Sequence, residues 1–345
     1  MRGLRNYNLR WAILAIGLFL SVMSSSSPGG VGTTAWSSIP CPVEGSADSW
    51  ALKRINESSI LKQDLLGEGV IVAVIDTGID FSSVSGALPW TAPGEIMGNG
   101  VDDDQNDYVD DIHGWNFYST TPIGSNPMLG HWHGTFVAGL IGDKCFGVAP
   151  NVTLMDLRVT DARGRIESWE AIMDAIHYAV DNGAEIINLS LTFNSPPPES
   201  VLSALEYAQK HDVVVIGSAG NSGNEVMFPA RLRNVWAISA TGRDDTIAAF
   251  SSRGSAVALA APGMDVPSLL PNGRYAVASG TSFAAAYVSG AMAVLASSRR
   301  GSHMDQLRIL QESAVDLGDP GADPLYGWGR IDLTRAVRSL AKIAP

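Results

Sequence analysis

Short apolar runs alternate along this chain with amphipathic segments of helical length, and this alternation restricts the fold more than any other feature. The strand-like runs are residues 70–75, 151–158, 185–191, 213–216 and 235–240. Runs this short and this apolar are typical of strands buried on both faces of a parallel sheet. Residues 168–182 and 199–210 have helical periodicity. We therefore predict the α/β class, with a doubly wound, mainly parallel sheet and helices on both faces.

The first 48 residues differ from this pattern. Arg2, Arg5 and Arg10 precede an uncharged, nearly all-apolar run at 11–23. That run falls short of the roughly 20 residues that span a bilayer, and it fits the core of a signal peptide. We predict a signal peptide at 1–24 with cleavage within 24–35, a flexible leader at 25–48, and a single domain at 49–345. The protein is then secreted or held in the cell envelope or periplasm, with membrane attachment only if the signal is uncleaved.

Charge and cysteine content narrow the classes of function. The formal net charge is -12, and Lys and Arg form no cluster, which argues against a nucleic-acid partner. Cys41 and Cys145 fit either one disulfide in an exported protein or two separate thiols. The His and Cys residues lack the spacing of a zinc site. We expect a monomer.

Four polar residues stand where serine-peptidase chemistry would need them. Asp76 directly follows the run 70–75, and His133 opens a segment of small and apolar residues. Ser282 precedes a long apolar helix, and Asn221 lies in a Gly-rich turn. A serine nucleophile needs a base, a carboxylate that orients the base, and a donor for the oxyanion. Each residue alone also has an ordinary interpretation, as a turn residue, a core histidine, a helix cap or a turn asparagine.

The motifs in this order resemble the subtilisin-like serine proteases (subtilases). The resemblance rests on Asp76-Thr77-Gly78, His133-Gly134-Thr135, Ala219-Gly220-Asn221 and Gly280-Thr281-Ser282, in the order Asp, His, Asn, Ser. It implies a subtilisin-like fold and a secreted endopeptidase that works through an acyl-enzyme. Asp76 would orient, His133 would be the general acid and base, Ser282 would attack, and Asn221 would bind the oxyanion. His131 lies two residues away, but Gly134-Thr135 favours His133. The alternative is a catalytically inactive subtilase-fold binding protein.

The resemblance also implies how substrate binds. A polypeptide in extended conformation would pair with Ser190, Leu191 and Thr192, by addition of a strand to a sheet edge. Ser218, Ala219 and Gly220 would form the second wall of the first specificity pocket. Met227 stands where the family often has a small residue at the pocket floor. We expect Met227 and Thr192 to narrow or reshape that pocket.

An acidic stretch at 102–111 contains six aspartates and no Lys or Arg. The alternating oxygen donors resemble a calcium loop, with ligands from Asp102, Asp104, Asn106, the Tyr108 carbonyl and Asp110. The stretch lacks the Gly and Glu of an EF-hand. A structural calcium ion is one interpretation, and a solvated acidic loop is the other. Catalysis itself is expected to need no cofactor.

Overall fold

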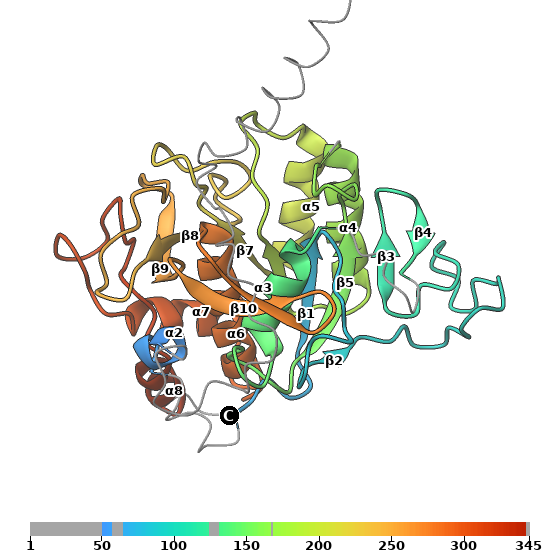
Figure 1. Cartoon of the computed structure of the whole chain (residues 1–345), viewed down its shortest axis with the longest axis horizontal. Helices are drawn as coiled ribbons and strands as arrows, with labels where there is room; N and C mark the ends of the chain where they lie inside the picture. Colours follow the sequence, from blue (N-terminus) through green and yellow to red (C-terminus); the bar gives the residue numbers. More distant parts are fainter. Residues whose placement is uncertain (1–49, 57–64, 124–130, 167, 343–345) are drawn as a thin grey trace, which may run out of the picture.

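The computed structural model describes residues 50–56, 65–123, 131–166 and 168–342 (Figure 1). The predicted signal peptide and leader lie outside the described residues. The strands are β1 (Ile71–Asp76), β2 (Leu88–Pro89), β3 (Gly114–Asn116), β4 (Thr121–Pro122), β5 (Thr153–Arg158), β6 (Ile186–Leu189), β7 (Val214–Ser218), β8 (Trp236–Thr241), β9 (Val257–Pro262), β10 (Val266–Leu270) and β11 (Arg274–Ala278). The helices are α2 (Trp50–Arg54), α3 (His133–Gly142), α4 (Trp169–Asp181), α5 (Glu199–Lys210), α6 (Thr281–Ala296), α7 (His303–Glu312) and α8 (Leu333–Leu340).

The main sheet is mostly parallel, as the alternation of runs and helices predicts. Its strand order is β4-β3-β5-β1-β6-β7-β8-β9, with β2 also paired to β5. All the pairings from β3 to β9 along this path are parallel, and β3 with β4 is antiparallel. β10 and β11 form a separate antiparallel hairpin. The predicted α/β fold with a mainly parallel sheet is confirmed.

Both faces of the sheet are covered, which explains why its strands are apolar without alternation. On β1, Val72 and Val74 face one core cluster, while Ala73 and Ile75 face the other. The first cluster includes residues of α3 and α6, and the second includes residues of α4 and α5. Figure 1 shows α4 and α5 on one side of the sheet and α3 and α6 on the other. Every residue of α6 is buried, which suits its small and apolar sequence.

The parallel arrangement brings distant segments to one edge of the sheet. Asp76 is the last residue of β1, and Ser218 is the last residue of β7. Because parallel strands all end at the same edge, the segments that follow them meet there. The strand predicted at 185–191 is shorter in the structure and ends at Leu189. Ser190 to Thr192 therefore continue beyond the sheet, at the edge where Asp76 lies.

Two further findings concern the predicted leader and membrane attachment. Cys145 is disulfide-bonded, and the other cysteine of the chain, Cys41, lies outside the described residues. Within the described segments, no helix combines the length and apolar character needed to cross a bilayer.

Candidate active site

Asp76 and His133 are brought into direct contact by the end of β1 and the start of α3. The Nδ1 atom of His133 lies 2.8 Å from Asp76 Oδ1 and 3.0 Å from Oδ2. Asp76 is fully buried, and its Oδ1 also accepts the backbone N–H of Thr77. Because a carboxylate only accepts, Nδ1 carries the proton, and Nε2 of the neutral ring is the basic nitrogen. His131 accepts the Thr77 hydroxyl through its backbone carbonyl, and its ring lies 6.3 Å from the His133 ring, but among the described residues it forms no hydrogen bond with Asp76.

Two features of its surroundings shift the pKa of His133 in opposite directions. Burial of the ring would lower the pKa of His133, but the charge of Asp76 and its hydrogen bond outweigh burial and raise that pKa. The rings of Trp132 and Phe283 lie 5.7 and 5.8 Å from the His133 ring. These aromatic neighbours limit the water around the imidazole, which strengthens its interaction with Asp76.

A second buried carboxyl lies near Asp76. Asp156 of β5 is 1% exposed, and its Oδ2 accepts the N–H of Ile79. Burial is the main cause that raises the pKa of Asp156 to about 7, and the negative charge of Asp76 contributes. A substantial fraction of Asp156 is therefore neutral near pH 7, which limits the excess negative charge beside Asp76.

Ser282 is the second residue of α6, and it is not the helix cap that an isolated serine there would suggest. Gly280 takes the cap position. The Ser282 hydroxyl donates to the Ser190 carbonyl at 3.1 Å, and the Ser190 hydroxyl donates to the Ser282 carbonyl at 3.0 Å. Among the described residues we find no hydrogen bond from Ser282 to His133. Nucleophile–base hydrogen bonds are often long without substrate, so this geometry is compatible with a catalytic pair.

The side-chain amide of Asn221 is oriented by two hydrogen bonds to its oxygen. Its Oδ1 accepts both the backbone N–H and the hydroxyl of Thr281, each at 2.9 Å. Since both partners donate, the oxygen of the amide must face Thr281, and the NH₂ group points away from it. The N–H of Ser282, in the first turn of α6, has no partner within the helix. Thr281 is a residue that sequence reasoning missed, although it adjoins Ser282 in the quoted motif.

The residues predicted to bind substrate fall into two groups. Leu191 and Thr192 make no backbone hydrogen bond among the described residues, so their backbone groups are open to a partner strand. Ala219 and Gly220 differ, because their backbone groups already bond to neighbouring segments. They follow Ser218, the last residue of β7. The first group can pair with an extended peptide, and the second can only act as a wall.

Met227 lies directly against that wall. A Cβ atom built on Gly220 would come within 2.7 Å of both Cγ and Sδ of Met227. The Met227 N–H also donates to the Ala219 carbonyl at 2.9 Å. The thioether therefore occupies space beside Gly220 that a smaller residue would leave open.

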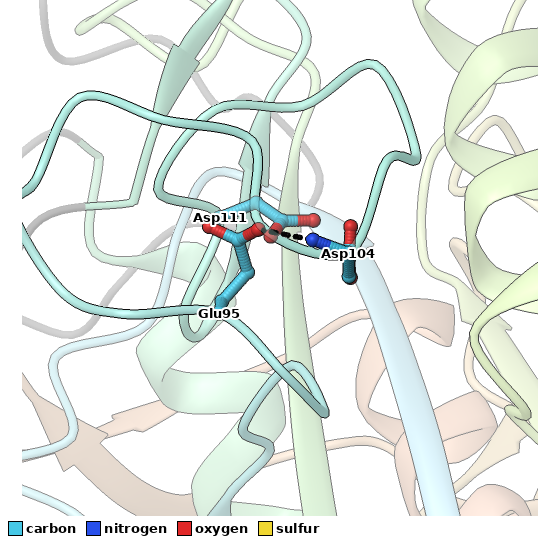
Figure 2. A group of neighbouring side chains, drawn as sticks. All are labelled: Glu95, Asp104 and Asp111. Carbon is cyan, nitrogen blue, oxygen red and sulfur yellow. Dashed lines mark hydrogen bonds between the residues drawn. The ribbon is translucent and has the colours of Figure 1, made fainter.

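Three carboxyl groups of the acidic region come close enough to share a cation. Single oxygens of Glu95, Asp104 and Asp111 all lie within 4.8 Å of one another (Figure 2). Asp111 is fully buried, and its Oδ1 has no hydrogen-bond partner. Burial and the charges of Asp111 and Glu95 raise the pKa of Asp104 to about 6. Oxygen-only donors of this kind suit a hard divalent cation.

The five predicted ligands are placed differently within this loop. Only Asp104 belongs to the three-carboxylate cluster, and the Asn106 amide donates to Asp104 and Asp111. Asp102 accepts the N–H groups of Asn106 and Asp107. Asp110 accepts those of residues 98–100.

Two members of the cluster were missed from the sequence, for different reasons. Glu95 lies outside the acidic stretch. Asp111 falls off the alternation of Asp102, Asp104 and Asn106. Tyr108, whose carbonyl was the remaining candidate, packs its ring 4.9 Å from the ring of Tyr178.

Comparisons with known proteins identify the family of the chain. A sequence model described as the subtilase family matches residues 67–329. The thermophilic serine proteinase of Bacillus sp. (strain AK1) is 34% identical over 78% of this chain, which spans 62% of that protein. Subtilisin BL of Lederbergia lenta is 32% identical over 84% of this chain and 98% of its own length. Thermitase of Thermoactinomyces vulgaris is 31% identical over 79% of this chain and 90% of its own.

A solved structure is similar as well. The crystal structure of a lanthipeptide protease superposes with a TM-score of 0.69 at 27% identity. The match covers 85% of this chain and 94% of that one. The likeness therefore extends over nearly all of the sheet and its helices.

Proposed function

Since the chain belongs to the subtilase family of serine-type endopeptidases, we propose that it is an active, exported peptidase with the triad Asp76, His133 and Ser282. The observation that carries the proposal is the two-oxygen contact between Asp76 and His133 Nδ1, which leaves Nε2 as the base. Ser282 lies at the start of the neighbouring helix α6. Export is proposed from the basic residues and apolar run at 1–24.

The chemistry follows from these groups. Ser282 Oγ attacks the peptide carbonyl, and His133 Nε2 takes the hydroxyl proton. Asp76 stabilises the imidazolium that forms, which agrees in direction with the raised pKa of His133. His133 then gives the proton to the leaving amine. Water, activated by the same nitrogen, hydrolyses the acyl-enzyme and releases the second product.

The negative charge on the tetrahedral intermediate needs donors that are already in place. We assign this role to Asn221 Nδ2 and the backbone N–H of Ser282. Thr281 fixes the Asn221 amide by two hydrogen bonds, so the donor group needs little reorganisation during the reaction. The positive end of the α6 dipole favours the same charge.

Substrate binding is proposed along the segment Ser190–Thr192. The unpaired backbone groups of Leu191 and Thr192 can accept an extended peptide as an added strand. Ser218 to Gly220 would then face the side chain before the scissile bond. Polypeptides are the substrate class.

The active state can be tested with a fluorophosphonate, which labels only a serine that has been activated by its base. We expect rapid labelling at Ser282 in the native protein, and none after thermal denaturation. Mass spectrometry of the tryptic peptide locates the label. If the native protein resists labelling at neutral pH, the alternative of an inactive binding protein holds instead.

We expect Met227→Ala to broaden the first specificity pocket. The Met227 side chain fills space beside Gly220, and its removal makes room for a larger substrate side chain. Accommodation of one or two more methylenes changes the transition-state free energy by roughly 1–3 kcal/mol. The ratio of kcat/KM for Phe over Ala before the scissile bond should rise by about tenfold or more.

The ratio of kcat/KM values is measured with peptide p-nitroanilides that differ only in the residue before the scissile bond. The matched control is Met304→Ala, since Met304 is a partly buried methionine of α7. It should reduce stability to a similar extent and leave the ratio unchanged. An unchanged ratio in Met227→Ala would mean that this side chain does not limit the pocket.

We also propose that a calcium ion stabilises the protein at Glu95, Asp104 and Asp111. The unpartnered, buried Oδ1 of Asp111 supports this placement, because a buried carboxylate oxygen without a partner is costly. The residues fit a calcium ion in donor type and closeness. Calcium would offset the burial and the mutual repulsion that together raise the pKa of Asp104 to about 6. Its role is structural, since the proposed triad chemistry uses no metal.

Calcium is expected to raise the free energy of unfolding by about 2.7 kcal/mol at a hundredfold excess over its Kd. The effect should fade below about pH 6, where Asp104 takes up a proton and loses its affinity for the cation. Melting curves with calcium and with chelator measure it. Glu95→Gln with Asp104→Asn should abolish the response, and Asp102→Asn with Asp110→Asn should retain it. If the second pair abolishes the response instead, the ion lies among the alternating residues 102–110.

A further inference from the structure

A cavity of about 710 Å³ opens where β8 and β9 begin. Its walls come from residues 225, 226, 231–233, 235 and 236, and from residues 253–256 and 258. In the parallel register Trp236 pairs with Ile216 of β7, two residues before Ser218, and Val257 pairs with Ala237. The volume falls within the range of roughly 300–1,000 Å³ typical of small-molecule sites. The cavity wall contains none of the proposed catalytic or substrate-binding residues, although Val226 and Arg231 adjoin Met227.

The charge in this cavity is opposite to that of the whole chain. The chain has 35 acidic and 23 basic residues, yet the cavity walls contain Arg231, Arg233, Arg253 and a single acid, Glu225. Arg231 pairs with Glu225, donates to the Val226 carbonyl at 2.8 Å, and lies over the Phe228 ring. Glu225 thus balances one of the three guanidinium groups.

The other two arginines have no acidic partner. Within the described part of the chain, neither Arg233 nor Arg253 forms an ion pair, although acids outnumber bases overall. Arg253 donates weakly to the Ala249 carbonyl at 3.4 Å, and its buried Nε has no partner at all. A guanidinium does not lose its proton in a protein, so Arg233 and Arg253 keep their positive charges. An anion in the cavity would supply the counter-charge that no acidic side chain of its wall gives them.

Apart from Gly254 and Ser255, the rest of the cavity wall is apolar. Val226, Leu232, Val235 and the partly buried Trp236 line it together with Ala256 and Ala258. A small inorganic anion would leave these surfaces wet. We propose that the cavity binds an organic anion whose carboxylate pairs with Arg233 and Arg253 while its apolar body lies against Trp236 and Leu232. Planar guanidinium groups suit a carboxylate because they donate two parallel hydrogen bonds.

Calorimetric titration tests the proposal with three probes. The probes are 4-phenylbutyrate, its neutral amide, and inorganic phosphate, at low ionic strength. The Ser282→Ala protein is used, so that autolysis is avoided and the result does not depend on the catalytic assignment. We expect 4-phenylbutyrate to bind at least tenfold more tightly than the amide, and more tightly than phosphate. If phosphate binds as tightly as 4-phenylbutyrate, the apolar wall does not contribute and the proposal is wrong. If the neutral amide binds as tightly as 4-phenylbutyrate, the cavity does not select an anion and the proposal is again wrong.

Variants locate the binding. Arg233→Gln with Arg253→Gln should weaken 4-phenylbutyrate at least tenfold, while the exposed Arg308→Gln on α7 should leave it unchanged. Arg233→Gln alone is the second variant, because Arg233 is exposed and its loss should not affect folding. This single substitution should weaken the binding of 4-phenylbutyrate severalfold. If 4-phenylbutyrate binds both arginine variants as tightly as the parent, it binds elsewhere and the proposal is wrong.

Discussion

Replacement of Ser282 by alanine is expected to lower kcat on the order of a million-fold and to leave the fold intact. The magnitude is that of subtilisin itself, where loss of the nucleophile has this effect. The physical reason is that the Ser282 oxygen is the only atom proposed to form the acyl bond. The change removes one hydroxyl, which forms a single hydrogen bond within the described part of the chain, to the Ser190 carbonyl. A small cost in stability is therefore expected beside a very large cost in rate.

The measurement is kcat on a peptide substrate, in a preparation free of contaminating protease, with the melting temperature recorded alongside. Ser297→Ala is the matched control, since Ser297 caps the other end of α6 and donates to the Val294 carbonyl. It should retain full activity. Residual activity of Ser282→Ala above about a hundredth of the parent would refute the assignment of the nucleophile.

The sheet could be predicted because its strands are buried on both faces. β1 is accordingly apolar at every position except its last, Asp76. β5 and β6 are apolar in the same way except for the buried Asp156 and Asn188 and for residues at the ends of β5. The length of β6 could not be predicted in the same way. Ser190 and Leu191 are also buried, with exposed fractions of 4% and 8%, yet they lie beyond the end of β6 at Leu189. Burial records packing against a core, and it does not record which backbone groups are paired.

The acidic cluster shows where sequence spacing fails. Spacing predicts ligands well when a loop has a fixed path, as in an EF-hand. Here the loop bends back, so that Glu95 accepts the N–H groups of Asp103 and Asp104. That contact brings Glu95 to Asp111 across sixteen positions of the chain. Asp102 and Asp110 instead hold the loop backbone through accepted hydrogen bonds. Nothing in the residue order distinguishes the two uses of an aspartate.

The triad motifs were easier to place than the contacts that support them. Asp76 and His133 each follow from a strand end and a helix start, which the apolar pattern marks. The role of Thr281 needed coordinates, because its hydroxyl both donates to Asn221 and accepts from the Gly220 N–H. This residue links the two loops that would surround the oxyanion. A threonine at a helix start gives no sign of such a link in the sequence.

Asn221→Ala is expected to lower kcat by roughly 100- to 1,000-fold, or about 2.7–4 kcal/mol of transition-state stabilisation, as the corresponding asparagine does in subtilisin. KM should change little, because the Asn221 amide would donate to the oxyanion and not to the carbonyl of the bound substrate. Asn224→Ala, an exposed asparagine three residues on, is the control and should keep the parent kcat.

The link through Thr281 sharpens this experiment. Thr281→Val removes one of the two hydrogen bonds that orient the Asn221 amide and keeps the other, which comes from the backbone. Its loss in kcat should therefore lie between those of the parent and of Asn221→Ala. In the Asn221→Ala background Thr281→Val should cost little more, since the amide it orients is already gone. Full additivity of the two losses would show that Thr281 does not act through the Asn221 amide. A rise in KM at unchanged kcat for Asn221→Ala would show that Asn221 contacts the ground-state substrate and that the oxyanion is stabilised by other donors.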